Sequence, residues 1–416
     1  MERTILHVDL NNFYASVEAL HNVHYRTVPM AVTGDIELRH GVVLAKNQIA
    51  KQMGVKTGDT VIEARRKCPN IEFCPANFSL YLRFSQLARA IYERYTDKVE
   101  SFGIDECWLD VTSSLKLFGS GEKIADEIRS TLLKELGVTA SVGVSFNKIF
   151  AKLGSDYKKP NATTCITKEN YKQIAFPQPV ENLIYVGKAT KEKLNHIGIK
   201  TIGDLARADK NALISLLGVW GEYLHNFANG EDKSEVRTVG TYSVIKSVGN
   251  STTTKRDMNK REDVEYIVNL LSESVAARLK QYDFKGLSVS LYVRSSNLLT
   301  QNKQSTLKFA TNSSAEIARV AMQIFDKLNI KTISLRSVGV QVSNLVKSED
   351  CEVQLDMFEN VNNVLKREKL EKGIDNIRSK FGHNIIKKAI LFTDENLTEL
   401  SNPKDENIIH PIGFRK

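Results

Sequence analysis

Three carboxylates lie beside apolar segments, where a charged side chain needs compensation. Asp9 directly follows the apolar segment 4–8, which we expect to form a β-strand. Asp105 and Glu106 lie within residues 104–110, whose apolar members predict a mostly buried strand. Adjacent carboxylates near a core repel each other and are costly to desolvate unless a cation compensates them. Three other Asp-Glu pairs occur in helix-like or loop-like surroundings, so the inference depends on the context of the pair.

A pair of divalent metal ions is the natural compensation for such a cluster. Mg²⁺ prefers hard oxygen ligands and completes its coordination shell with water and substrate phosphates. Two such ions about 4 Å apart can activate an attacking hydroxyl and stabilise the leaving oxygen in phosphoryl transfer. The alternative is structural, with Asp105 and Glu106 capping a turn or pairing with lysines.

Composition and charge exclude several classes of protein. The 416 residues, 42% hydrophobic and 26% charged, can bury more than one core and exclude disorder throughout. Lys and Arg number 58 against 49 for Asp and Glu, and the net charge of +9 favours an anionic partner without requiring one. The chain has no run of about 18 apolar residues, no signal-peptide core and no Cys-x-x-Cys pair. We therefore expect a cytoplasmic monomer with no membrane partner, disulfide framework or structural zinc site.

The positive charge is concentrated in one segment. Residues 1–240 carry 31 basic and 28 acidic side chains, residues 241–346 carry 15 and 8, and residues 347–416 carry 12 and 13. The middle segment therefore holds a net +7 (15 − 8) of the total +9. This distribution predicts a polyanion-binding domain after a nearly neutral core, with scattered solvating lysines as the alternative.

Alternating strand-like and helix-like patterns predict an α+β core with helices on one face of a sheet. The expected helices are 79–100 and 122–136, and the expected strands are 4–8, 104–111 and 139–144. A helical, short-looped segment follows at 167–233. Residues 241–346 then return to a βαββαβ pattern, with helices at 262–281 and 314–328 and alternating strands at 287–294 and 334–342. A polar linker at 347–352 leads to a tail with a helix around 370–381.

Several stretches, in order and at matching spacing, resemble motifs of the Y-family, or translesion, DNA polymerases. They are Asp9-Leu-Asn-Asn-Phe-Tyr-Ala-Ser-Val-Glu18, Gly41-Val-Val43, Ala50-Lys-Gln-Met-Gly-Val-Lys-Thr-Gly58, Ile104-Asp-Glu106, Gly143-Val-Ser145 with Ala151-Lys152, and Lys158-Lys-Pro-Asn161. The similarity spans roughly residues 1–346, and the bacterial DNA polymerase IV (DinB) and UmuC-like branches are the most similar. Several ordered motifs together are far more specific than any one of them.

The resemblance implies a right-hand polymerase with palm, fingers, helical thumb and βαββαβ little finger. By motif, the palm takes residues 1–10 and 78–166, the fingers 11–77, the thumb 167–240, the little finger 241–346, and a clamp-binding linker with a helical tail 347–416. The implied activity is that of a DNA-directed DNA polymerase, a nucleotidyltransferase performing low-fidelity translesion synthesis past damaged template bases. Primer–template DNA and deoxynucleoside triphosphates are the implied partners.

The resemblance also assigns roles to the carboxylates. Asp9, Asp105 and Glu106 would be the catalytic ligands of two Mg²⁺ ions. The Leu10 carbonyl is a further implied ligand. One ion would lower the pKa of the primer 3′-hydroxyl, and the other would bind the triphosphate and the departing pyrophosphate. Tyr14 occupies the steric-gate position, where an aromatic ring excludes a 2′-hydroxyl; without the motif, an ordinary core aromatic would be the better interpretation.

Further positions would contact the incoming nucleotide. The implied nucleotide-binding residues are Phe13, Tyr14, Gln48, Lys51 and Lys159. A point charge on a flexible stem suits a polyphosphate, so Lys159 agrees with simple chemistry. Gln48 and Lys51 depart from the Tyr and Arg of many members, and Lys51 supplies charge without bidentate geometry. The implied roof of the nascent base pair consists of Val32, Val42, Leu44 and Gly58.

Two regions resemble DNA-contacting elements. Residues 186–205 resemble a helix-hairpin-helix, in which Gly187 and Lys188 would approach phosphates. Its usual Gly-x-Gly is incomplete because Tyr185 holds the first position, so a plain helical turn is the alternative. The implied little-finger contacts are Lys246, Ser247, Gly249, Lys255 and Arg256. Contacts of this type position a duplex and make its affinity salt-dependent without reading sequence.

Gln354-Leu-Asp-Met-Phe358 resembles the bacterial sliding-clamp peptide. In that peptide Gln354 would anchor, and Leu355, Met357 and Phe358 would fill an apolar cleft. Five-residue matches arise by chance, but apolar side chains in a polar linker have no obvious core to join. We therefore expect the β sliding clamp as a partner, and we assign no function to the tail after Phe358.

Two non-polymerase interpretations compete with this one. A scaffold that binds DNA and clamp without catalysis would be favoured by loss of a carboxylate, and all three carboxylates are present. A two-metal nuclease would not need Tyr14 at a steric gate or Lys159 at a triphosphate.

Overall fold

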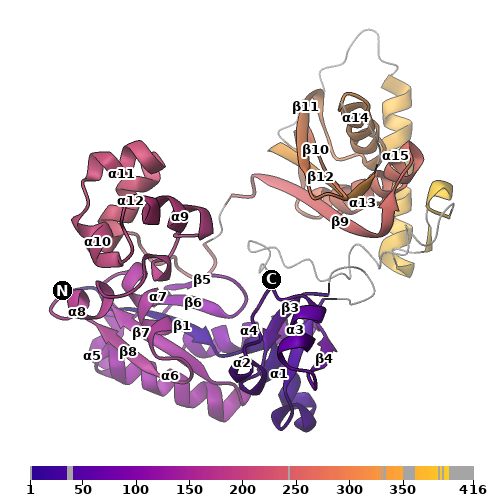
Figure 1. The fold of residues 1–416 in the computed structure, drawn as a ribbon. Helices are drawn as coiled ribbons and strands as arrows, with labels where there is room; N and C mark the ends of the chain where they lie inside the picture. The colour runs from indigo at the N-terminus through magenta and orange to yellow at the C-terminus, as the bar shows by residue number, and fades with distance from the viewer. Residues whose placement is uncertain are drawn as a thin grey trace. The chain divides into compact units, whose positions relative to one another are not determined.

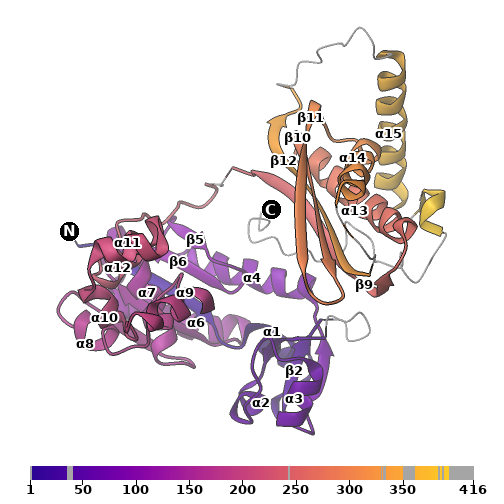
Figure 2. The ribbon, with the colours of Figure 1, turned by 45° about the horizontal axis from the view of Figure 1, so that its top comes forward.

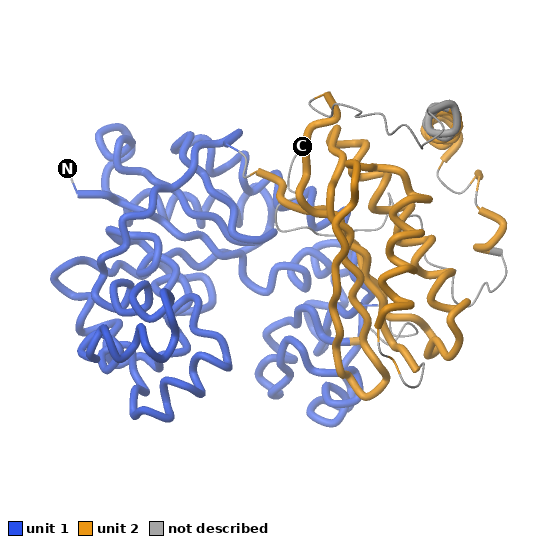
Figure 3. Tube along the Cα trace, turned by 90° about the horizontal axis from the view of Figure 1, so that it is seen from above, with its two compact units in different colours: residues 1–34, 42–242, 409–416 blue, residues 35–41, 243–408 orange. Residues whose placement is uncertain are grey.

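The computed structural model describes residues 2–34, 41–241, 244–328, 330, 334–349, 361–382, 385–386 and 388–392. The described residues divide into two compact units (Figure 3). The first unit extends to residue 34 and from 42 to 242, and the second contains the described residues from 244 to 392. None of the helices in these described ranges combines the length and apolarity needed to cross a membrane.

A five-stranded sheet forms the centre of the first unit (Figure 1). Its strands lie in the order β5 (Val99–Ser101), β6 (Glu106–Asp110), β1 (Ile5–Leu10), β7 (Ala140–Ser145) and β8 (Thr163–Ile166). All six residues of β1 are buried, because the strand has neighbours on both edges and helices against both faces. The expected strands at 4–8, 104–111 and 139–144 are thus confirmed to within two residues.

Helices cover both faces of this sheet, so the expectation of helices on one face is wrong. The helices α4 (Phe78–Tyr92) and α6 (Gly121–Leu136) pack on the face that carries Leu6 and Val8 of β1. The helix α7 (Lys148–Tyr157) packs on the opposite face. It approaches so closely that a Cβ on Gly143 would overlap the Ala151 carbonyl oxygen and the Ser155 nitrogen.

The expected helix 79–100 ends early. Its α4 counterpart stops at Tyr92, and i→i−3 hydrogen bonds from the Arg94 and Tyr95 amides close the last turn. Residues 99–101 instead form β5, whose Val99 pairs with Leu109 at the edge of the sheet. Edge pairing with β6 is a tertiary contact that helical spacing alone does not reveal.

A smaller sheet completes the first part of this unit. Its strands lie in the order β3 (Val43–Lys46), β2 (Met30–Thr33) and β4 (Glu72–Pro75). The helix α1 (Phe13–His21) begins three residues after β1, and α2 (Gln48–Gln52) and α3 (Val61–Lys67) accompany the small sheet. The start of α2 is fixed by Asn47, whose side chain accepts a hydrogen bond from the Ala50 amide.

Short helices form the rest of the first unit, as the segment 167–233 predicts. They are α5 (Leu115–Phe118), α8 (Tyr171–Ala175), α9 (Lys188–His196), α10 (Ile202–Arg207), α11 (Lys210–Leu217) and α12 (Val219–Ala228), of which α8 to α12 fall in that segment. Buried side chains of α8 to α12, among them Leu194, Ile202, Leu205 and Leu213, share one core with residues of α7 and β8.

The second unit has the expected βαββαβ order (Figure 2). Its elements are β9 (Ser247–Met258), α13 (Arg261–Gln281), β10 (Phe284–Ser295), β11 (Thr300–Thr311), α14 (Ser314–Asp326) and β12 (Leu335–Lys347), with strand order β11-β10-β12-β9. The helices α13 and α14 bury the face that carries Val289, Leu291 and Val340. Alternate residues must face the other way, and there they are polar.

The tail after the sheet folds back on this unit. The helix α15 (Val361–Phe381) carries Glu371 and Asp375, whose carboxylates lie 2.9 and 2.8 Å from the Nζ of Lys280 on α13. Arg378 Nη2 lies 3.0 Å from Oε2 of the buried Glu273, also on α13. A helix around 370–381 was expected, but its docking through ion pairs to α13 was not.

Candidate active site

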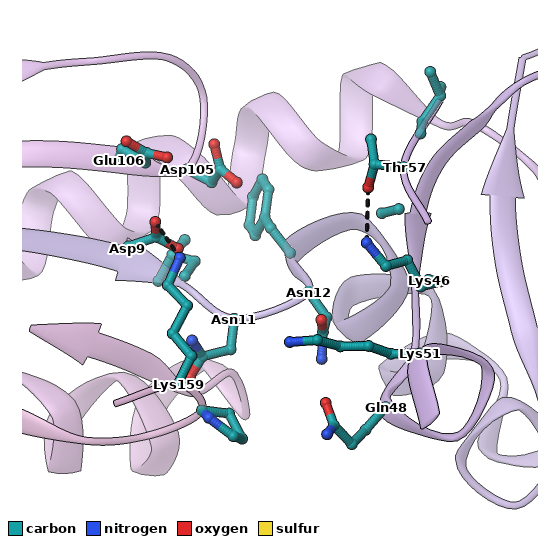
Figure 4. A pocket seen from close by; sticks show the side chains of 15 residues that line it. Asp9, Asn11, Asn12, Lys46, Gln48, Lys51, Thr57, Asp105, Glu106 and Lys159 are labelled. Atoms are coloured by element: carbon teal, nitrogen blue, oxygen red, sulfur yellow. Dashed lines mark hydrogen bonds and ion pairs between the residues drawn. The ribbon is translucent and has the colours of Figure 1, made fainter. Parts of the chain in front are cut away.

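A pocket of about 270 Å³ opens between the two sheets of the first unit (Figure 4). Its walls come from the β1–α1 turn, the start of β6, the segment after α7, and the β3–α2 region. The lining residues are Asp9, Leu10, Asn11, Asn12, Phe13, Leu44, Ala45, Lys46, Gln48, Lys51, Thr57, Asp105, Glu106, Lys159 and Pro160. The three carboxylates singled out from the sequence therefore meet in one place, with Lys159, Gln48 and Lys51.

Strand register brings the carboxylates together. Asp9 of β1 is the direct cross-strand partner of Glu106 of β6, so their side chains project from the same face of the sheet. The Leu10 amide donates a hydrogen bond to the Asp105 carbonyl at 3.1 Å, which extends the pairing to the residue before β6. Asp9 is only 5% exposed, so its charge must be balanced inside the protein.

Two lysines balance Asp9 and Glu106. The Lys152 Nζ lies 3.2 Å from Asp9 Oδ2 and 2.9 Å from Glu106 Oε2. The Lys159 Nζ lies 2.6 Å from Asp9 Oδ2 and 2.7 Å from Asp156 Oδ1. The sequence left open that Asp105 and Glu106 pair with lysines, and this alternative describes Glu106, which contacts Lys152.

Asp105 differs from the other two carboxylates. Among the described residues, no Lys, Arg or His side chain lies within 4.0 Å of its carboxylate. Burial and the neighbouring charges of Asp9 and Glu106 raise the pKa of Asp105 to about 7. For Glu106, burial is outweighed by His7 and Lys152, which hold its pKa below the usual range. One carboxylate of the three therefore lacks a cation.

The donor chemistry fits a hard divalent cation, although the side chains are not yet gathered around one. No three His, Cys, Asp or Glu side chains in the described ranges are clustered as a ready metal site. Asp9, Asp105 and Glu106 nevertheless offer only carboxylate oxygens to one pocket, which is the ligand type that Mg²⁺ prefers. The uncompensated charge of Asp105 is the observation that favours a cation there.

His7 was missed by the sequence analysis. Its Nδ1 lies 2.8 Å from Ser155 Oγ, and its Nε2 lies 3.3 Å from Glu106 Oε2. The imidazole is fully buried, and burial lowers its pKa. The two-residue period of a strand could have revealed it, because His7 must share a face with Asp9. Lys152 could have been found from its place in the motif that ends at Ala151-Lys152.

The nucleotide-contact candidates divide into two groups. Phe13, Gln48, Lys51 and Lys159 line the pocket, whereas Tyr14 does not. The Tyr14 ring instead stacks on Tyr81 at a centroid distance of 4.3 Å, and burial with the Asp105 charge raises its pKa to about 12. Tyr14 is therefore packed beside the site as the structure stands.

The four roof candidates lie on neighbouring segments: Val32 on β2 is opposite Ala45 of β3, and the Gly58 amide donates a hydrogen bond to the Val43 carbonyl, between Val42 and Leu44. Leu44 lines the pocket, and Val42 is 36% exposed. Gly58 adopts a φ of +90°, which favours glycine. Val32 is fully buried in the core of the unit, so its side chain presents no surface to a base.

The hairpin candidates Gly187 and Lys188 lie at the N-terminus of α9. Gly187 is the N-cap of this helix, and both Gly187 and Lys188 are exposed. Tyr185, which replaces the first glycine of the usual hairpin, has a φ of +71°, a conformation that glycine adopts more easily. The backbone thus keeps the glycine-type conformation despite the substitution. The Tyr185 ring packs near Trp220 and Phe227.

The second-unit candidates belong to β9 and its start. Gly249 on β9 pairs with Gln341 on β12. Gln341 pairs in turn with Ser290 on β10, and Ser290 pairs with Gln304 on β11. This row crosses all four strands on the face opposite α13 and α14 and is made of small or neutral polar residues. Ser247 is two residues from Gly249 on that face, and Lys246 is exposed.

Arg256 has a structural partner that sequence reasoning did not foresee. Its guanidinium forms two hydrogen bonds with Asp263, at 3.1 and 2.9 Å. Lys255 precedes it on β9 and is partly buried. The clamp-peptide residues Gln354, Leu355, Met357 and Phe358 lie outside the described residues.

Comparison with known proteins agrees with this geometry. The impB/mucB/samB family matches residues 8–156, and the C-terminal domain of that family matches residues 245–357. DNA polymerase IV of Acetivibrio thermocellus is 49% identical over 403 residues, which cover 96% of this chain and 100% of that protein. DNA polymerase IV of Clostridium acetobutylicum is 36% identical, covering 95% and 100%, and DNA polymerase IV 1 of Bacillus subtilis is 35% identical, covering 95% of each.

A solved structure has the same fold. A Y-family DNA polymerase chimera superposes with a TM-score of 0.73 and 22% sequence identity, over 83% of this chain and 99% of that one. The α+β architecture and the C-terminal antiparallel sheet expected from the sequence are thereby confirmed. Membership of a DNA polymerase family implies metal-dependent catalysis with DNA and deoxynucleoside triphosphates as substrates. The chain belongs to the impB/mucB/samB family of Y-family translesion polymerases and is a DNA-directed DNA polymerase.

Proposed function

We propose that this polymerase performs low-fidelity synthesis past damaged template bases by two-metal nucleotidyl transfer and is recruited by the sliding clamp. One observation carries the chemistry. Asp9 and Glu106 face each other across β1 and β6, beside the uncompensated Asp105, in a pocket whose other wall carries lysines. Such a pocket can bind cations at its carboxylates and phosphates at the lysines of the opposite wall.

The sheets and motifs support the domain assignment. The five-stranded sheet with α4, α6 and α7 corresponds to the palm, residues 1–10 and 78–166. The three-stranded sheet corresponds to the fingers, 11–77, and the helices α8 to α12 to the thumb, 167–240. The second unit begins at residue 243, which supports a little finger over 241–346.

Asp9, Asp105 and Glu106 would hold two Mg²⁺ ions, and the Leu10 carbonyl would add a ligand. When bound, these ions lower the pKa of the primer 3′-hydroxyl and stabilise the departing pyrophosphate. The ammonium groups of Lys152 and Lys159 now neutralise Asp9 and Glu106 and must share or yield these contacts. Burial raises the pKa of Asp9 and the two lysines oppose this effect, whereas for Glu106 burial is outweighed by His7 and Lys152, which hold the pKa below its usual range.

Lys159 would exchange partners during nucleotide binding. Its Nζ contacts Asp9 and Asp156 in the structure, and it lines the pocket with Lys51 and Gln48. A triphosphate offers stronger charge than a shared carboxylate, so it would draw this ammonium group away from Asp9. Tyr14 would act as steric gate beside Phe13, after a small movement from its stack on Tyr81.

DNA binding is proposed for the thumb hairpin and the little finger. The Gly187 and Lys188 segment offers exposed backbone amides at the start of α9, which suit phosphate contacts. The polar row through Gly249 and Gln341 offers small neutral groups to a duplex backbone. Sequence-independent binding of this kind suits an enzyme that must copy any template.

Clamp recruitment is supported by the place of its peptide in the chain. Residues 354–358 follow β12 and precede α15, and both flanking elements belong to the second unit. Gln354 and the apolar Leu355, Met357 and Phe358 therefore stand between two folded elements, in a polar linker. This position suits a peptide that is bound by a partner protein.

Primer extension on damaged and undamaged templates tests the proposed function. We expect the wild-type enzyme with Mg²⁺ to copy an undamaged template and to add nucleotides opposite and beyond a defined template lesion. Nucleotides mispaired with the template should appear at readily measurable frequency. An enzyme that copies the undamaged template but always stops one nucleotide before every lesion of a panel would contradict the translesion assignment.

A further inference from the structure

Lys46 is a pocket residue to which neither the motifs nor the comparisons assign a role. It ends β3, lines the pocket, and is partly buried. Its Nζ donates a hydrogen bond to Thr57 Oγ1 at 2.8 Å (Figure 4). Thr57 also lines the pocket, and it follows α2 after a tight turn. A hydroxyl from another segment thus holds the Lys46 ammonium group at the wall of the pocket.

Lys46 lacks a carboxylate partner among the described residues. Asp59 is the acidic residue whose charge acts on it, and Asp59 is already paired with Lys67 at 2.6 Å. Burial and the neighbouring Lys51 lower the pKa of Lys46. An ammonium group held by one neutral hydroxyl, beside a second lysine, is electrostatically unsatisfied.

The charges around Lys46 indicate what kind of ligand this side of the pocket can bind. Lys46 and Lys51 extend from one side of the pocket, and Asp9 stands on the other (Figure 4). Asp9 and Glu106 are paired with lysines of their own side, so they do not balance Lys46. The wall therefore offers two positive charges to whatever occupies the pocket.

We propose that Lys46, positioned by Thr57, binds the triphosphate of the incoming nucleotide. This inference rests on the proposed use of the pocket as the nucleotide site. Gln48 on this wall is neutral, and Lys51 supplies one point charge without the bidentate geometry of a guanidinium. Lys46 adds a second charge to the same wall and so strengthens its anion binding.

Phosphate is the ligand group that fits this geometry. An ammonium group on a flexible stem binds phosphate oxygens as a point charge and does not discriminate planar bases. The bond to Thr57 reduces the freedom of the Lys46 stem, so less entropy is lost when phosphate binds. Binding through phosphate also predicts equal effects on all four deoxynucleoside triphosphates.

The test measures triphosphate affinity directly. Each deoxynucleoside triphosphate is titrated, with Mg²⁺, into the full-length enzyme bound to a template whose primer ends in a dideoxynucleotide, so that no chemistry follows. Lys46→Ala should weaken binding about tenfold, equivalent to about 1.4 kcal/mol, for all four nucleotides. Lys46→Arg should retain most of the affinity. Lys56→Ala is the matched control, because Lys56 is exposed in the same segment and does not line the pocket.

Thr57 provides a second, independent test. Thr57→Val removes the hydroxyl and keeps the shape, so it should weaken binding by about threefold, whereas Thr57→Ser should not. Because Thr57 acts through Lys46, adding Thr57→Val to Lys46→Ala should cause no further loss. Additive losses would overturn the positioning role, and melting temperatures identify any variant that fails to fold.

The outcomes separate this inference from the pocket assignment. If Lys46→Ala binds all four nucleotides as tightly as Lys56→Ala and wild type, the inference on Lys46 is wrong and the pocket assignment stands. If Lys159→Ala and Lys51→Ala also bind every nucleotide with wild-type affinity, the pocket is not the nucleotide site. A loss confined to one nucleotide would indicate a base contact and would also overturn the proposal.

Discussion

Replacing Arg256 with Ala should destabilise the second unit more than it weakens DNA binding. The guanidinium makes a bidentate ion pair with Asp263, whose side chain is 6% exposed. The same carboxylate accepts hydrogen bonds from the amides of Asn259 and Lys260 at the start of α13. The resemblance assigned Arg256 to DNA, but its charge is already balanced within the protein.

The size of the effect follows from burial on the two sides of the pair. Removing one partner of a fully buried pair costs about 3–5 kcal/mol, because the other charge is left uncompensated. Arg256 is 42% exposed, so solvent screening reduces this cost, and two backbone amides still hold Asp263. We expect a loss of about 1–2 kcal/mol in the free energy of unfolding.

Urea unfolding and hydrogen exchange measure this loss in the full-length protein. The amides of Asn259 and Lys260 should exchange faster in Arg256→Ala, because their acceptor is less firmly held. Lys246→Ala is the matched control: it removes the same charge from an exposed position beside β9. It should leave stability unchanged within about 0.5 kcal/mol.

For DNA binding we expect the opposite ranking of the two variants, with the larger loss in Lys246→Ala. Lys246→Ala should reduce the salt slope of DNA binding by about 0.9, the value for one phosphate contact, whereas Arg256→Ala should change it by less than about half of that. If Arg256→Ala leaves stability and amide exchange unchanged and lowers the salt slope by a full contact, the structural assignment of Arg256 is refuted.

The stability difference should also depend on pH in one direction. Burial raises the pKa of Asp263, but Arg256 and the two backbone amides outweigh this effect and hold it below the usual value. An acid whose pKa is lowered by folding contributes stability above its unfolded pKa of about 3.9 and loses it as the pH falls through the folded value. Wild type and Arg256→Ala should therefore converge below about pH 4.

Three further predictions concern other parts of the chain. Tyr14→Ala should raise ribonucleotide incorporation about tenfold or more, because the ring no longer excludes the 2′-hydroxyl; an unchanged ratio in a competition assay would remove the steric-gate role. Joint replacement of Met357 and Phe358 by Ala should abolish clamp-stimulated synthesis and leave unstimulated synthesis intact, and equal loss of both would indicate a folding role. Arg378→Ala removes the ion pair to buried Glu273 and should speed amide exchange in α15 about tenfold or more, whereas the exposed Lys380→Ala should not. Equal exchange in both variants would contradict docking through Arg378.

The sequence predicts best where local pattern and burial agree. The βαββαβ order of the second unit and the strand ending at Asp9 are confirmed because their apolar alternation or periodicity coincides with the core face. The helix expected to reach residue 100 is wrong because β5 is defined by pairing with β6, a contact distant in sequence. The helix α7 was not expected at all, although its close approach to Gly143 places Lys152 in the site.

The candidate site shows the same division. Motif position identified the pocket-lining Asp9, Asp105 and Lys159, because their roles depend on residue type and order. His7 and Lys46 escaped notice because their roles depend on neighbours that only folding supplies, Ser155 for one and Thr57 for the other. The resemblance suggested a DNA contact for Arg256, and the structure gives it Asp263 as a partner.

The rate of a single nucleotide addition in Asp105→Asn tests the central claim most directly. Asp105 is an uncompensated carboxylate, and folding raises its pKa to about 7. Its charge therefore costs stability above that pH, and replacement by Asn should leave the melting temperature at pH 8 in metal-free buffer unchanged or higher.

We predict that Asp105→Asn slows addition in Mg²⁺ about a thousandfold or more, the loss of about 4 kcal/mol of transition-state stabilisation. The control Glu127→Gln, in one of the other Asp-Glu pairs and on α6 with a side chain 42% exposed, should add nucleotides at the wild-type rate. An Asp105→Asn enzyme that adds nucleotides as fast as wild type would contradict the assignment of this pocket as the catalytic site.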